Sequence, residues 1–274
     1  MGVPFGEIWR AAGAEKAAAA WYDAAAGEGG SYHGDWWFHA ASTIKVAVLV
    51  ATFSAVARGR FELDDPVHVR NRFLSVVDGS PYRIDRVRDS DATVHAQVGR
   101  LMTVGDLATR MIVASSNLAT NLLVDLIGLE EARADFDRLG VQGVELERGV
   151  EDEQAWAAGI NNRVTANGLV ALFRLIHEGR AISADASRRM LTILHQQQFK
   201  SGIPAGLPAK ARVAHKTGEI STIAHDAGLV YLPRRRPIAL AVLTQWEPGK
   251  GARSALIAAM TRALFESLVP KGHR

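Results

Sequence analysis

A serine and a lysine stand three residues apart at the start of a long apolar run. Ser42 and Lys45 belong to the segment FHAASTIKVAVLV, residues 38 to 50. On a helix, side chains three residues apart lie on one face, so the hydroxyl and the amine can approach each other. A lysine whose pKa is lowered by burial could take the proton of the serine, which would make the hydroxyl a nucleophile. The alternative interpretation is a helix-capping serine followed by a lysine whose amine reaches solvent.

Two further polar clusters lie later in the chain. SSN, Ser115 to Asn117, interrupts an apolar helical segment with three polar side chains, which need partners if they are buried. KTG, Lys216 to Gly218, ends a predicted strand with a cation, a hydroxyl and a glycine that permits close backbone approach. Taken singly, SSN is typical of a helix break and KTG of an edge strand before a turn. The order STIK, SSN, KTG is much more specific than any one of the three motifs.

In this order the motifs resemble those of the serine β-lactamase and penicillin-binding protein family, which carries SxxK, S-x-N and KTG. The similarity is closest to class A β-lactamases, since SSNLATNLLVDLIG is similar to the class A segment that follows S-x-N. The resemblance covers most of the chain. It implies an α+β fold, a three-layer α/β/α sandwich with a five-stranded antiparallel sheet and an all-helical subdomain. It also implies a serine hydrolase that opens β-lactam amides through an acyl-enzyme.

The resemblance implies a role for each residue of the first two motifs. Ser42 would be the acylated nucleophile and Lys45 its proton acceptor or relay. Ser115 would pass a proton to the leaving nitrogen. Asn117 would hydrogen-bond the side-chain amide of the substrate.

The third motif would bind the substrate. Lys216 and Thr217 would hold the substrate carboxylate, and Gly218 would leave room for an extended ligand. The backbone N–H groups of Ser42 and Glu219 would form the oxyanion hole. The negative side chain of Glu219 would then lie beside the expected carboxylate site, which is unfavourable for anionic ligands unless it points away.

Hydrolysis of the acyl-enzyme needs a further base, which class A enzymes supply with a glutamate followed by Leu-Asn. In ERGVEDEQAWAAGINNRVTA, Glu151 lies at a suitable spacing from Ser115 and is the candidate base. No Leu-Asn follows it, so Asp152, Glu153 and a solvated acidic turn remain alternatives. Without a carboxylate that reaches a water beside Ser42, the acyl-enzyme would persist. The function would then be that of a D-alanyl-D-alanine peptidase, an esterase or a penicillin-binding protein without turnover.

Two further departures from the family pattern concern the surroundings of the cleft. Many class A enzymes have an arginine on the strand after KTG, where this chain has His225 and Asp226. His225 is a candidate contact for the substrate carboxylate, and a structural histidine is the alternative. The segment from about residue 65 to 100 is longer than in typical family members and could overhang the cleft.

Hydrophobic periodicity predicts the elements that must position these residues. It indicates a strand pair before residue 41, helices from Ser42 onward, three strands after residue 210 and a final helix over 252–269. We predict one unit over 1–274, in which 1–41 and 205–274 form a sheet subdomain and 42–204 form a helical subdomain. The cleft is expected at their junction.

Composition and charge narrow the class of protein. The chain has 274 residues, 48% of them hydrophobic, so it can bury a large core. Its net charge is +3, and its basic residues are dispersed except in PRRRP at 233–237, which argues against nucleic-acid binding. The lack of cysteine excludes disulfides, a thiol nucleophile and thiolate metal ligands. The nine histidines form no HExxH or HxH pattern, so we expect no metal and no other cofactor.

The expected partner is a small molecule, a β-lactam or a D-Ala-D-Ala-like compound, and the expected oligomeric state is a monomer. No segment reaches about 18 unbroken apolar residues, so no membrane span is predicted. The first residues lack the apolar stretch of a signal peptide. The sequence therefore favours either a cytoplasmic protein or the mature form of a secreted or periplasmic one.

Overall fold

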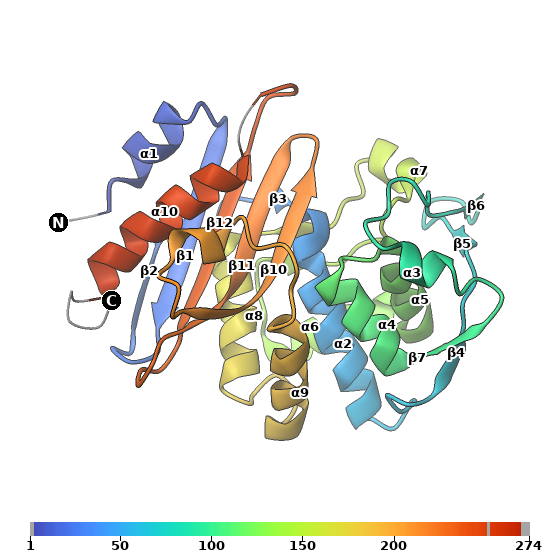
Figure 1. Cartoon of the computed structure of the whole chain (residues 1–274). Helices are drawn as coiled ribbons and strands as arrows, with labels where there is room; N and C mark the ends of the chain where they lie inside the picture. Colours follow the sequence, from blue (N-terminus) through green and yellow to red (C-terminus); the bar gives the residue numbers. More distant parts are fainter. Residues whose placement is uncertain (1–2, 251–252, 270–274) are drawn as a thin grey trace.

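The central sheet is assembled from segments near both ends of the chain (Figure 1). In this computed structural model, which describes residues 3–250 and 253–269, five strands follow the order β10-β11-β12-β1-β2, and every neighbouring pair is antiparallel. The strands are β1 (Lys16–Asp23), β2 (Glu28–Tyr32), β10 (Arg212–Ile220), β11 (Ile223–Tyr231) and β12 (Ile238–Gln245). The predicted five-stranded antiparallel sheet is confirmed.

Helices cover both faces of this sheet, as Figure 1 shows. On one face lie α1 (Phe5–Ala11) and α10 (Arg253–Leu268), and on the other α8 (Ala166–His177) packs against β1, β11 and β12. Strands β11 and β12 are buried along almost their whole length. Most of β12 is a continuous apolar run, whereas β11 also buries His225 and Asp226. Strand β1 contains four successive alanines, Ala17 to Ala20, and their small side chains let α8 pack closely against the strand. The predicted three-layer sandwich is therefore confirmed.

The other helices form the second half of the molecule around α2 (Lys45–Ala57), which is buried on nearly all sides. Against it pack α4 (Val104–Val113), α5 (Asn117–Ile127), α6 (Leu129–Leu139) and α9 (Ala184–Leu194). The α-helix was expected to begin at Ser42. Instead, the 3-10 helix η1 (Ala41–Ile44) makes the first turn, and the α-helix begins at Lys45.

The long segment before α4 contains several short elements. They are β4 (Pro66–His68), β5 (Phe73–Leu74), β6 (Pro81–Tyr82), α3 (Ala92–His95) and β7 (Leu101–Thr103). Three more strand fragments, β3 (Phe38–His39), β8 (Val144–Glu145) and β9 (Arg163–Val164), form a small sheet, and α7 (Glu153–Ala157) and η2 (Ile203–Gly206) complete the chain. Within the described ranges, none of the helices combines the length and the apolar composition that crossing a membrane requires.

Two apolar clusters hold these layers together. The larger lies between the sheet and the helices around α2, and the smaller lies between the sheet and α1 and α10. The subdomain borders at residues 41/42 and 204/205 stay a prediction. Helix α8 belongs by sequence to the helical segment, yet it packs directly on the sheet.

Candidate active site

Ser42 stands in a tight turn between β3 and α2. Ala41 has a left-handed backbone with φ of 45°, and its N–H donates to His39 Nδ1 at 3.1 Å. The hydroxyl of Thr43 donates to the carbonyl oxygen of Ala40 at 2.6 Å, which fixes the other side of the turn. The side chain of Ser42 is only half-buried and faces a cavity of about 290 Å³.

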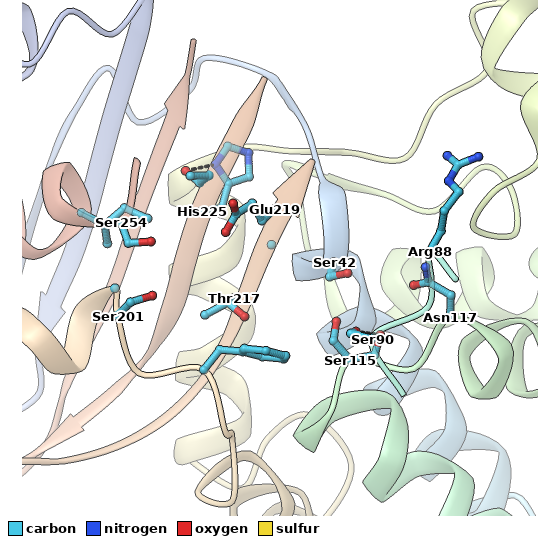
Figure 2. Close-up of a pocket in the computed structure, with 15 residues that line it drawn as sticks. Ser42, Arg88, Ser90, Ser115, Asn117, Ser201, Thr217, Glu219, His225 and Ser254 are labelled. Carbon is cyan, nitrogen blue, oxygen red and sulfur yellow. Dashed lines mark hydrogen bonds between the residues drawn. The ribbon is translucent and has the colours of Figure 1, made fainter. Parts of the chain in front are cut away.

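Figure 2 shows Ser42 between two walls of this cavity. Thr217 and Glu219 come from the sheet side, and Ser115 and Asn117 come from the helical side. The hydroxyl of Ser42 makes no hydrogen bond with any described residue, so it is available to a substrate.

Lys45 begins α2, three residues after Ser42, and its side chain is completely buried. Its Nζ donates to the carbonyl oxygen of Ser115 at 2.6 Å and to Asn117 Oδ1 at 2.7 Å, and it lies 3.2 Å from Ser115 Oγ. Burial lowers the pKa of Lys45 to about 7, against the opposing effect of the Asp89 and Glu151 carboxylates. A neutral amine is therefore accessible near neutral pH, and a neutral amine can accept a proton.

Ser115 joins all three sequence motifs. Its hydroxyl accepts a hydrogen bond from Lys216 Nζ at 3.0 Å and is also the neighbour of Lys45. Burial, and next the charge of Lys45, hold the pKa of Lys216 well below its usual range. The break between α4 and α5 lets Ser115 adopt a left-handed backbone, with φ of 61°, which turns its side chain into the cavity.

Three successive acidic residues lie in different surroundings. Glu151 Oε1 accepts from Asn117 Nδ2 at 2.6 Å, so this carboxylate belongs to the cluster around Lys45. Asp152 is buried and accepts from Ala155 N at 3.0 Å, as the N-cap of α7. The side chain of Glu153 is 75% exposed and pairs with Arg88 at 2.8 Å. Of the three carboxylates, the geometry brings only that of Glu151 to the polar cluster.

The edge of the sheet passes directly beside the nucleophile turn. A Cβ atom on Gly218 would lie 3.0 Å from the backbone nitrogens of Ser42 and Thr43, so any other residue would force the strand and the turn apart by a few tenths of an ångström. The next residue, Glu219, has an exposed side chain that lines the cavity and makes no hydrogen bond with described residues. Strand β10 thus brings the backbone of Gly218, the residue before Glu219, beside the turn that carries Ser42.

The family assignment follows from sequence comparison together with this geometry. The model of the β-lactamase enzyme family matches residues 7–268. The chain belongs to this family. A β-lactamase from Streptomyces fradiae is 27% identical over 258 residues, which cover 90% of this chain and 79% of the relative.

Solved structures of β-lactamase family members and of a penicillin-binding protein are also similar. The protein PBP-A superposes with a TM-score of 0.81 at 26% identity, covering 96% of this chain and 94% of its own. A β-lactamase from Sphaerobacter thermophilus superposes with a TM-score of 0.79 at 28% identity, covering 97% and 96% of the two chains.

In this member of the β-lactamase family, His225 is held by the backbone. Its Nδ1 accepts from the N–H of Thr244 at 3.1 Å, and its Nε2 lies 3.1 Å from the carbonyl oxygen of His39. Burial lowers the pKa of His225 to about 4, so the ring is neutral at neutral pH. His225 borders the cavity, but it offers no charge to a carboxylate. These contacts favour the structural alternative.

Sequence reasoning missed Asp89, which supports the SSN turn. This buried carboxylate accepts from the N–H groups of Asn117 and Leu118, both at 3.0 Å, and lies 3.1 Å from His95 Nε2. It therefore binds the first N–H groups of α5 and fixes the start of that helix. Asp89 is one of several Asp and Arg residues in its segment, and no pattern in the sequence distinguishes it.

Ser90 and Arg88 were also missed. The hydroxyl of Ser90 donates to the carbonyl oxygen of Ala114 at 2.9 Å, next to Ser115, and both Ser90 and Arg88 line the cavity. Within the described ranges, no group of three or more His, Asp or Glu side chains could hold a metal ion.

Proposed function

We propose that this chain is a serine β-lactamase of the class A type, which opens β-lactam amides through an acyl-enzyme on Ser42. One observation carries the proposal: Asn117 connects the carboxylate of Glu151 to the amine of Lys45. Asn117 Nδ2 donates to Glu151 Oε1 at 2.6 Å, and Lys45 Nζ donates to Asn117 Oδ1 at 2.7 Å. A carboxylate at this place gives the acyl-enzyme a base for hydrolysis, which a protein that only binds penicillin does not need.

Acylation begins when neutral Lys45 takes the proton of the Ser42 hydroxyl. The oxygen of Ser42 bonds to the lactam carbonyl carbon, and the N–H groups of Ser42 and Glu219 stabilise the oxyanion. As the carbon–nitrogen bond breaks, Ser115 gives its proton to the nitrogen and regains one from Lys45. In net terms one proton has passed from Ser42 to the leaving nitrogen by way of Lys45 and Ser115, and Lys45 is neutral again.

Deacylation uses water as the second substrate. Glu151 takes a proton from a water molecule, and the oxygen of that water bonds to the acyl carbon. The ester bond to Ser42 breaks, and the proton held by Glu151 returns to the serine oxygen. The product is the ring-opened acid.

The substrate is bound between the two walls of the cavity. We assign the side-chain amide of the substrate to Asn117, and the substrate carboxylate to the hydroxyl of Thr217 with Lys216 behind it. Gly218 leaves the edge of β10 open to an extended ligand. We expect the chain to act as a monomer, which light scattering of the purified protein tests.

The test is the mass of the intact protein at short times after mixing with a penicillin. A transient adduct with steady formation of product is the expected result. A stable adduct would instead indicate a D-alanyl-D-alanine peptidase, an esterase or a penicillin-binding protein without turnover. A PBP-A variant has been solved as such an acyl-enzyme adduct with penicillin G. No adduct at all would refute the proposal. The variant Ser42→Ala should form none, whereas Ser183→Ala, in the remote cap of α9, should still form it.

A further inference from the structure

The loop that carries Glu151 is bound by the segment 73–91, which lies far from it in sequence. Asp152 Oδ1 accepts from the hydroxyl of Ser75 at 2.9 Å, and Asp152 Oδ2 accepts from the N–H of Val76 at 3.1 Å. Glu151 Oε2 accepts from the N–H of Asp85 at 3.3 Å. The hairpin of β5 and β6 and the loop after it therefore contact two successive acidic residues.

These contacts differ in strength because they differ in burial. Asp152 is 1% exposed and Ser75 is 5% exposed, so their hydrogen bond is shielded from water. A hydrogen bond to a carboxylate that is shielded from water contributes more to stability than an exposed ion pair. The ion pair of Arg88 with Glu153 joins side chains that are 59% and 75% exposed, and such pairs contribute little. The connection between the two segments depends mainly on Asp152.

The backbone of Glu151 explains why this connection matters for the carboxylate. Glu151 has φ of 59°, a left-handed conformation that is strained for a residue other than glycine. Such a conformation persists only where both neighbours are fixed. Val150 is fixed on one side by Asn121, which accepts from its N–H at 2.7 Å and donates to its carbonyl oxygen at 2.9 Å. Asp152 is fixed on the other side by Ser75.

We propose that Ser75 and Asp152 are positioning residues for the base Glu151. The hydroxyl of Ser75 holds the carboxylate of Asp152, and Asp152 in turn holds the left-handed turn that directs Glu151 toward Asn117. The hairpin of residues 73–82 thereby sets the rate of deacylation, while acylation depends on Lys45, Ser115 and Lys216. This inference rests on the proposed role of Glu151.

The test is the variant Ser75→Ala, with acylation and deacylation rate constants measured separately by rapid quenching and intact mass. We expect deacylation to slow by roughly tenfold to a hundredfold, as for a base displaced by about 1 Å. Acylation should stay within about twofold of the wild type. The variant Ser75→Thr keeps the hydroxyl and should restore most of the deacylation rate. The matched control is Ser183→Ala, which removes one side-chain hydrogen bond at the cap of α9.

Two outcomes would overturn the inference. One is a folded Ser75→Ala variant whose deacylation rate is unchanged, and the other is an equal slowing of both steps. If Ser75→Ala does not fold, Asp152→Asn, which keeps the size of the side chain and an acceptor for Ala155 N, is judged by the same two rate constants. If the wild-type chain itself forms no adduct or never releases it, the proposed function fails instead. The wild-type measurement thus tests the proposed function, and the comparison of variant with wild type tests the role of Ser75 and Asp152.

Discussion

Lys45 and Lys216 bring their amine nitrogens to one hydroxyl, that of Ser115, at 3.2 and 3.0 Å. Two buried cations that share one neighbour repel each other strongly, because little water screens them. Burial lowers the pKa of both lysines, that of Lys45 to about 7. The pair therefore releases a proton near neutral pH, and the site holds its own proton acceptor for Ser42.

The rate of acylation should rise with pH through about 7, the pKa of Lys45. Below that pH the amine is protonated and cannot take the proton of Ser42, so the rate should fall about tenfold per pH unit. Single-turnover acylation by a penicillin, measured from about pH 5 to pH 9, checks this. A flat profile over that range would show that Lys45 is not the acceptor.

The same shift predicts how stability depends on pH. Lys45 has a lower pKa in the folded chain than its usual value of 10.5, so the unfolded chain binds more protons between about pH 7 and 10.5. Its contribution to the free energy of unfolding should rise with pH in that window and be constant below it. Urea titrations of the wild type and of Lys45→Met separate this contribution, and the rise should be smaller in the variant, where Lys216, whose pKa is also lowered, still contributes. Parallel pH curves for the two proteins would contradict the assignment.

Replacing Glu151 with Gln should trap the acyl-enzyme. The amide keeps the size of the side chain but cannot take a proton from water, so deacylation should slow by roughly 10²–10⁴-fold while acylation is retained. The control is Glu153→Gln, because Glu153 is exposed and pairs only with Arg88 among the described residues. Unchanged turnover in Glu151→Gln would mean that another group is the base.

Replacing Glu219 with Gln should speed acylation by anionic substrates. The carboxylate lines the cavity where the substrate carboxylate is expected, and removing a like charge should raise kcat/KM roughly threefold to tenfold. The gain should shrink as salt is added, since salt screens exposed charges. An uncharged ester substrate serves as the control and should show no gain. An equal gain for both substrates would argue against an electrostatic cause.

Replacing Gly218 with Ala should impair catalysis more than stability. The new methyl group would lie 3.0 Å from the nitrogens of Ser42 and Thr43, so the strand and the turn would have to separate by a few tenths of an ångström. We expect kcat/KM to fall roughly tenfold to a hundredfold. Gly105→Ala, within α4, should leave kcat/KM unchanged. A fully active Gly218→Ala enzyme would exclude a tight oxyanion hole at this place.

Much of the fold could be predicted from the sequence because local patterns determine it. The apolar runs after residue 210 predict the three adjacent strands, and the polar SSN cluster predicts the break between α4 and α5. The order of the three motifs indicated the family, and the structure brings Lys45, Ser115 and Lys216 into hydrogen-bond contact. Their catalytic roles stay a proposal.

The supporting residues could not be predicted because contacts between distant loops place them. Asp89 and Ser75 lie in the long segment before α4, where polar residues are common and no periodicity marks any of them. The choice among the carboxylates of residues 151–153 likewise depends on one backbone angle. The left-handed turn at Glu151 sends its side chain inward and leaves Asp152 to cap α7.

Five residues other than glycine have a left-handed backbone in the described part of the chain, and three of them, Ala41, Ser115 and Glu151, lie at or beside the reacting groups. Each lowers the resistance of the protein to heat by a small amount. Selection for heat tolerance alone would therefore favour glycine at these positions and erode activity. Substitutions that raise the thermal stability of this enzyme are better placed in the outer helices, far from the reacting groups, where greater rigidity does not reduce activity.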